Sequence, residues 1–68
     1  SKNTLYITFD GLSDPLGQSQ ILPYVVSLAQ HGYSITVLSC EKPTVLKNEK
    51  QNIDDALKGL PIQWKYIE

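Results

Sequence analysis

The segment between two apolar runs near the start of the chain constrains the fold more than any other part. Residues 4–9 are rich in β-branched and aromatic side chains, which favour a strand, and residues 21–29 repeat apolar side chains at helical spacing. Between them lies the polar segment 10–20, of which residues 10–17, with Gly11, Pro15 and Gly17, predict a loop leading from strand to helix. In open α/β sheets such a loop lies at the carboxyl end of the strand, where anions and polar ligands bind.

The rest of the chain continues the alternation of strand and helix. The first helix is expected to begin near Gln18 or Ser19, with Ser19 as a candidate N-cap, and to end at Gly32. Residues 34–39 then predict a buried strand, and residues 45–58 a more polar helix whose first half is expected to be loose. Residues 62–67 alternate apolar and polar side chains, which is typical of a strand with one solvated face.

This β-α-β-α-β order predicts a Rossmann-like half-domain with a three-stranded parallel sheet in the order 3-2-1. Two consecutive crossovers of the same hand put both helices on one face of the sheet. The other face and the outer edge of the first strand then stay uncovered. A chain of 68 residues is also short for an α/β domain. We therefore expect residues 1–68 to be a partial domain of a larger fold.

Composition excludes several classes of function. The net charge is −1, with six basic and seven acidic residues, so no basic surface for a nucleic-acid partner is expected. The single Cys40 can form no disulfide within the chain and no cysteine zinc site, and we expect no metal. No apolar run approaches the roughly 20 residues of a membrane span.

The candidate ligand-binding residues lie at the end of the loop. Gly17 would let a ligand approach closely, and the backbone N–H groups of Gln18 and Ser19 could donate to phosphate or sugar oxygens. The glycine spacing matches neither the dinucleotide motif nor the phosphate loop, because Gly-x-Gly-x-x-Gly and Gly-Lys-Ser/Thr are both absent. The competing interpretation is structural: a strand-to-helix connection that needs glycine for its own backbone.

Three carboxylates accompany these residues. Asp10 and Asp14 could accept hydrogen bonds from ligand hydroxyls, or cap the loop through local turns. Glu41 directly follows the second strand, where a Rossmann fold places an acid on a ribose, but without the glycine motif we expect a solvated charge. His31 is expected to interact with the dipole of a helix C-terminus rather than to act in catalysis.

The identities of the residues in this region are more informative than the spacing of its glycines. Residues 6–24 (Tyr-Ile-Thr-Phe-Asp-Gly-Leu-Ser-Asp-Pro-Leu-Gly-Gln-Ser-Gln-Ile-Leu-Pro-Tyr) resemble the amino terminus of bacterial family 4 glycosyltransferases, and residues 32–43 continue the resemblance. It covers residues 5–43, and its most specific part is the uninterrupted Asp-Pro-Leu-Gly-Gln-Ser-Gln of residues 14–20.

The resemblance implies a GT-B architecture, with two Rossmann-like domains and an active site between them. This chain would be the amino-terminal, acceptor-side segment, with the donor-binding domain absent. The parent enzyme would be a retaining hexosyltransferase that uses a nucleotide-sugar as donor substrate and needs no metal or cofactor. It would act in surface polysaccharide synthesis, on a glycan or lipid-linked acceptor, in the cytoplasm or in peripheral association with the inner membrane face.

The resemblance also implies roles for residues of this chain. The family's glycine loop corresponds to Asp14, Gly17, Gln18 and Ser19, in the stretch 14–19, and would face the donor phosphates. Asp10 and Glu41 are the candidates for contacts to the acceptor. No catalytic residue is expected within the chain, which would be inactive alone.

Two functions of other classes stay open. The first is a small non-catalytic α/β interaction module that dimerises through the open edge of its first strand. The second is a nucleotide-binding module without transfer activity.

Overall fold

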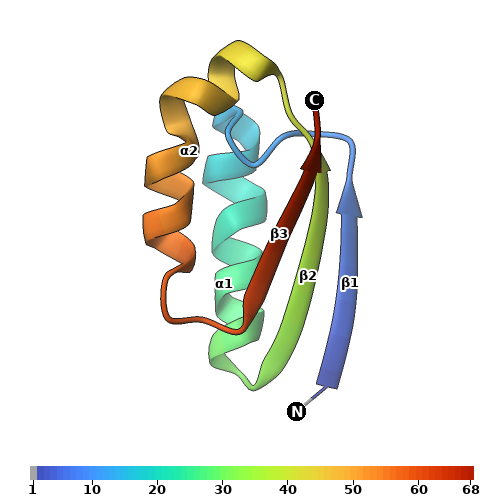
Figure 1. Cartoon of the computed structure of the whole chain (residues 1–68). Coiled ribbons are helices and arrows are strands. Elements are labelled where there is room, and N and C mark those ends of the chain that lie inside the picture. Colours follow the sequence, from blue (N-terminus) through green and yellow to red (C-terminus); the bar gives the residue numbers. More distant parts are fainter. Residues whose placement is uncertain (1) are drawn as a thin grey trace.

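The computed structural model describes residues 2–68 and shows an α/β fold with three strands and two helices (Figure 1). The elements are β1 (Lys2–Thr8), η1 (Gly17–Ile21), α1 (Leu22–Gln30), β2 (Tyr33–Cys40), α2 (Pro43–Leu57) and β3 (Ile62–Ile67). The strands pair in parallel in the order β1-β2-β3, which is the expected order 3-2-1 counted from the other edge. The α/β class and the parallel sheet are therefore confirmed.

Both helices cover the same face of the sheet, as the strand order and two like-handed crossovers predict (Figure 1). Side chains alternate along β2, so Ile35 and Val37 are buried beneath the helices while Thr36 and Leu38 lie on the other face. The main core joins both helices, β2 and one loop residue: Leu12, Val25, Ala29, Ile35, Val37, Ile53 and Leu57.

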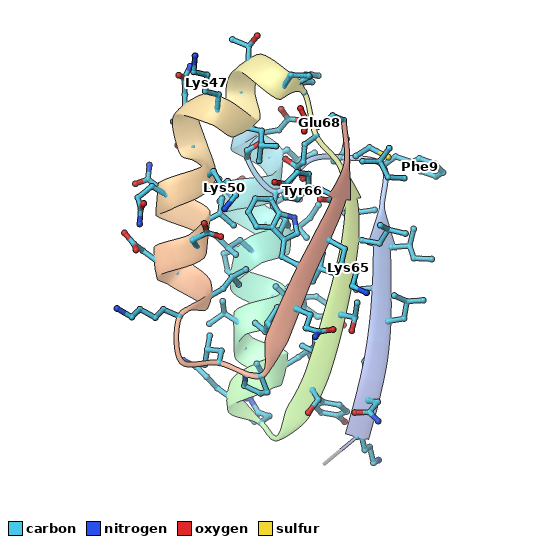
Figure 2. The ribbon with its side chains drawn as sticks, viewed as in Figure 1. Phe9, Lys47, Lys50, Lys65, Tyr66 and Glu68 are labelled. Carbon is cyan, nitrogen blue, oxygen red and sulfur yellow. The ribbon has the colours of Figure 1, made fainter. Side chains whose placement is uncertain are left out.

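The opposite face of the sheet is uncovered and partly apolar. Leu5 and Ile7 of β1 are each 61% exposed, and Ile67 of β3 is 58% exposed. Phe9, 90% exposed, projects away from the helices beyond the end of β1 (Figure 2). In the described sheet β1 pairs with β2 alone, so its outer edge is open. This is the open edge that the sequence predicted.

The first helical run begins earlier than the sequence suggested. Pro15 and Leu16 are already helical, and the hydroxyl of Ser19 donates to the Leu16 carbonyl oxygen at 3.3 Å, so Ser19 is not an N-cap. Proline is tolerated at this start because the first helical N–H groups have no partner.

A π-helical turn, η1, joins this start to α1. The N–H of Leu22 donates to the carbonyl of Gly17, five residues back. Pro23 follows immediately, and in a regular helix its ring would clash with the carbonyl four residues earlier. The wider turn before Pro23 lets the chain continue as one helical run.

The expectation of a loose first half in the second helix is wrong. α2 is helical from Pro43 onward because Leu46, 5% exposed, turns inward within its first turns. On the outer side Lys50 pairs with Asp54 at 2.6 Å, four residues later. The predicted end of the first helix at Gly32 is confirmed, since Gly32 has a φ of 96°, and Gly59, with a φ of 79°, follows the end of α2 in the same way.

Candidate functional site

The loop between β1 and η1 crosses the carboxyl end of the sheet next to the segment that follows β2 (Figure 1). We call residues 9–14 the site loop. Leu12 and Ser13 at its centre are 0% and 1% exposed, whereas connecting loops normally run over the surface. Buried backbone groups need hydrogen-bond partners, and Glu41 supplies them.

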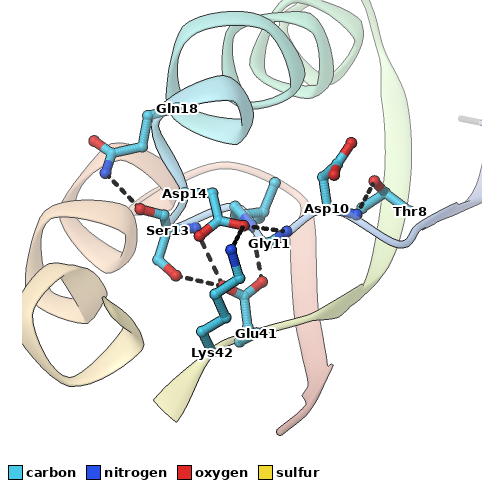
Figure 3. A network of polar contacts seen from close by, with 9 residues as sticks. Thr8, Asp10, Gly11, Ser13, Asp14, Gln18, Glu41 and Lys42 are labelled. Carbon is cyan, nitrogen blue, oxygen red and sulfur yellow. Dashed lines mark hydrogen bonds and ion pairs between the residues drawn. The ribbon is translucent and has the colours of Figure 1, made fainter. Parts of the chain in front are cut away.

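The carboxylate of Glu41 lies beneath the site loop and accepts hydrogen bonds from it (Figure 3). Oε2 accepts from the N–H of Leu12 at 2.8 Å, and Oε1 accepts from the N–H and the hydroxyl of Ser13 at 3.2 and 2.5 Å. The hydroxyl of Ser39 also donates to Oε2. Glu41 is 4% exposed, so the expectation of a solvated charge is wrong. The physical reason is that these donors replace the water that the carboxylate loses.

The pKa of the Glu41 carboxyl lies below its ordinary value. Burial alone would raise this pKa, because it disfavours the charged form. The hydroxyls of Ser13 and Ser39 and the N–H groups of Leu12 and Ser13 lower it by donating to the ionised form, and their combined effect is larger. Glu41 is therefore a carboxylate at neutral pH.

The same network reaches the third strand. The indole Nε1–H of Trp64 donates to Ser39 Oγ at 3.0 Å, and the Ser39 hydroxyl in turn donates to Glu41. Sequence reasoning placed both residues in strands and gave neither a place in the site. The available signal was alternation, which points both side chains to the covered face, and the position of Ser39 near the carboxyl end of β2.

The two glycines of this region are explained by close packing inside the loop. A Cβ added to Gly17 would lie 2.0 Å from the Gly11 carbonyl oxygen, and a Cβ on Gly11 would lie 2.6 Å from Glu41 Oε1. Both distances are shorter than a real carbon contact, so a side chain at Gly17 would force the loop backbone to move, and one at Gly11 would force the Glu41 carboxylate to move. The structural interpretation of Gly17 accounts for its presence without a ligand.

The donor groups at the helix start also differ from expectation. The N–H of Gln18 donates to the Asp14 carbonyl at 2.9 Å and is already part of the helical pattern. The N–H groups that precede this first helical bond belong to Leu16 and Gly17, because Pro15 has none. The set of backbone donors at the helix N-terminus is thus shifted toward the loop.

Asp14 and Gln18 hold the outside of the site loop. Oδ2 of Asp14 accepts from the Gly11 N–H at 3.4 Å and lies 3.9 Å from Lys42 Nζ. The side-chain amide of Gln18 donates to the Ser13 carbonyl at 3.0 Å and to Glu49 Oε1 at 3.1 Å. Asp14 thus caps the loop, which was one of its two proposed roles.

The other sequence candidates lie farther from this network. Asp10 is exposed at the rim, where its N–H donates to Thr8 Oγ1 at 3.1 Å. His31 lies at the C-terminal end of α1, with Nδ1 2.7 Å from the Ser27 carbonyl oxygen. The structure therefore brings Asp14, Gly17, Gln18 and Glu41 together around one loop, with Ser19 one residue further along the helix.

A groove beside the site loop, between η1 and α2, offers room for a ligand. Its lining combines hydroxyl, amide, carboxylate and apolar groups: Ser13, Pro15, Gln18, Ser19, Val45 and Glu49. Such a surface can exchange hydrogen bonds with a hydroxyl-rich molecule. Within residues 2–68 no group of three or more His, Cys, Asp or Glu side chains is arranged to hold a metal ion.

In comparisons with known proteins, no family model, no curated protein and no solved structure matches the chain. None of the helices in the described part of the chain has the length and apolar character needed to cross a bilayer.

Proposed function

We propose that this chain forms one wall of the active-site cleft of a retaining glycosyltransferase. The enzyme would transfer a sugar from a nucleotide-sugar to a glycan or lipid-linked acceptor in surface polysaccharide synthesis, at or near the cytoplasmic face of the membrane. Within the GT-B arrangement the chain would supply the amino-terminal, acceptor-side wall. A second domain would bind the donor, so the 68 residues alone would not transfer sugar.

The observation that carries the proposal is a preorganised polar loop at the carboxyl edge of a parallel sheet, directly before a helix. Ligands of open α/β folds bind at this edge. The loop leads into the Asp-Pro-Leu-Gly-Gln-Ser-Gln stretch on which the resemblance to family 4 glycosyltransferases rests. The position and the residue pattern thus favour the same function.

Two surfaces next to the loop would bind different parts of the substrates. The N–H groups of Leu16 and Gly17, at the positive end of the helical run, would stabilise negative charge on the donor phosphates as the nucleotide leaves. Gln18 and Ser19 would contact hydroxyls from the groove side, and Asp10 at the rim would accept from the acceptor. Glu41 is enclosed by the loop, so its contribution would be indirect.

Transfer of label from a panel of nucleotide-sugars to membrane lipids and oligosaccharides, catalysed by the enzyme that contains this chain, tests the proposal. Ser19→Ala should lower the transfer rate by up to about tenfold, because it removes one hydrogen bond to the ligand. Ser27→Ala is the matched control, because Ser27 belongs to the same helical run and lies outside the groove. Equal rates for the two variants would contradict the site, and no transfer from any donor would contradict the function.

The open edge of β1 favours a second candidate, the non-catalytic module that pairs with a second copy of itself. Two β1 strands aligned antiparallel about Tyr6 would place Leu5 opposite Ile7 of the other copy, and Thr4 opposite Thr8. Lys2 would lie opposite Asp10, just beyond the strand end. Apolar, hydroxyl and opposite-charge pairs of this kind stabilise antiparallel strands by about 0.2–1 kcal/mol each.

A further inference from the structure

The bonding around Glu41 is the pattern that a loop offers to a bound anion. The consecutive N–H groups of Leu12 and Ser13 converge on the carboxylate, together with the hydroxyl of Ser13 (Figure 3). The hydroxyl of Ser39, in β2, donates to the same carboxylate. Successive backbone N–H groups of a turn form a concavity that binds phosphate and other anions. In this protein a side chain from the end of β2 fills that concavity from within.

Two close contacts connect this carboxylate with the start of the helix. Oε1 of Glu41 lies so near Gly11 that a Cβ there would approach it to 2.6 Å. The Gly11 carbonyl lies against Gly17, where a Cβ would approach it to 2.0 Å. The carboxylate, the Gly11 backbone and Gly17 are therefore packed against one another in that order, up to the first helical turn.

A third contact holds the carboxylate itself in place. Ser39 Oγ accepts from the Trp64 indole, which leaves the hydroxyl proton of Ser39 directed at Glu41. The hydroxyl orientation is thereby determined, and β2 and β3 hold the carboxylate jointly. The buried side-chain polar atoms of this arrangement all have partners, since no buried side-chain nitrogen or oxygen lacks a hydrogen bond among the described residues.

We propose that Glu41 is a positioning residue that takes the place of a bound anion inside the site loop and sets the loop geometry before any ligand binds. Exogenous anions are then excluded from the inner side of the loop. Ligands meet only the outer side, at the helix start and the groove. What binds on that outer side rests on the proposed function, whereas the occupied inner position does not.

Chemical rescue tests this role directly. Glu41→Ala in the 68-residue chain opens a carboxylate-sized space lined by the donors of Leu12, Ser13 and Ser39. Amide hydrogen exchange of Leu12 and Ser13, measured by NMR, should accelerate by about 10–100-fold relative to the Val37 amide in the central strand. Added acetate should restore most of the protection because it refills the anion position. Acetamide, which has a similar shape and no charge, should restore little.

Glu41→Gln keeps the test decisive if the alanine variant fails to fold. The glutamine fills the space but directs an NH₂ group at donors that need an acceptor, so exchange should again accelerate at Leu12 and Ser13 specifically. Asp55→Asn, which removes an exposed carboxylate on α2, is the control and should leave both amides unchanged.

The proposal is overturned if acetamide rescues as well as acetate, or if both Glu41 variants accelerate all amides equally. The measurement needs no sugar substrate, so its failure is distinguishable from a failure of the proposed glycosyl transfer.

Discussion

Glu41 departs most from what its residue type suggests. A glutamate after a strand is ordinarily exposed, and here it is buried and organises the loop above it. The cost of removing its charge from water is offset by charge-assisted hydrogen bonds, which are about twice as strong as neutral ones. The lowered pKa of Glu41 expresses this balance, because the folded state favours the ionised form. Protonation should therefore destabilise the fold.

The sign of this effect predicts how stability depends on pH. The folded pKa of Glu41 lies below its unfolded value of about 4.5, so its contribution is complete above that pH and is lost as pH falls through the folded pKa. Urea unfolding followed by Trp64 fluorescence should show a loss of stability below about pH 4.5. Glu41→Gln should be less stable by about 2 kcal/mol at neutral pH and should show a smaller loss at acid pH. Parallel pH profiles for the two proteins would contradict this account.

At the scale of elements, the strand-to-helix connection is built from two unusual pieces. The centre of the site loop is buried where loops are normally exposed, and the helical run begins at a proline and passes through a π turn before Pro23. The two pieces meet where Gly17 packs against the Gly11 carbonyl, which brings the start of the helical run against the loop. The connection therefore behaves as one unit rather than as a flexible linker.

Gly17→Ala tests this unit. In an ordinary helix the change from glycine to alanine stabilises by about 1 kcal/mol, because alanine has the higher helix propensity. Here the added Cβ would lie 2.0 Å from a backbone oxygen, and the forced movement should instead destabilise by about 1–3 kcal/mol.

The midpoint of thermal or urea unfolding measures this difference. Ser19→Ala, in the same π turn but exposed, should change stability by less than about 0.5 kcal/mol. An alanine variant at position 17 that is as stable as the wild type would show that the loop can move away at little cost.

At the scale of the whole molecule, the sheet is covered on one face only. Leu5, Ile7 and Ile67 lie on the uncovered face, and the outer edge of β1 is open beside them. Exposed apolar surface next to an open strand edge favours association, whether with further strands of a larger domain or with a second copy. The two candidate functions differ in which of these partners covers β1.

A charge exchange distinguishes self-pairing of β1 from the alternatives. If two copies pair antiparallel about Tyr6, Lys2→Asp and Asp10→Lys should each weaken dimerisation by about 5–30-fold, because like charges then face each other at both ends. A mixture of the two variants should associate as tightly as the wild type. One variant then carries acidic side chains at both positions and the other carries basic ones, so opposite charges meet at each end of the pair.

Sedimentation equilibrium measures the wild type, each single variant and the mixture. A monomeric wild type, or a mixture as weak as the single variants, would rule out this pairing of β1.

Much of the architecture followed from local patterns. The alternation in residues 62–67, the apolar stripe of the first helix, and Gly32 and Gly59 each report a property of a few neighbouring residues. The strand order and the placement of both helices on one face then followed from the handedness of parallel crossovers. The site was predictable only as a location: the loop was placed correctly, whereas the burial of Glu41 and the helix start at Pro15 were missed.

The sequence by itself determined the order of elements, the parallel sheet and the loop at its carboxyl edge, because periodicity, turn residues and chain handedness act over short distances. The tertiary structure alone decided which groups meet inside that loop. Glu41 joins Leu12 and Ser13 from 28–29 residues away along the chain, and Trp64 joins Ser39 from 25 residues away. No local pattern encodes such a meeting, because it depends on the register of paired strands and on how closely two glycines let the backbone approach.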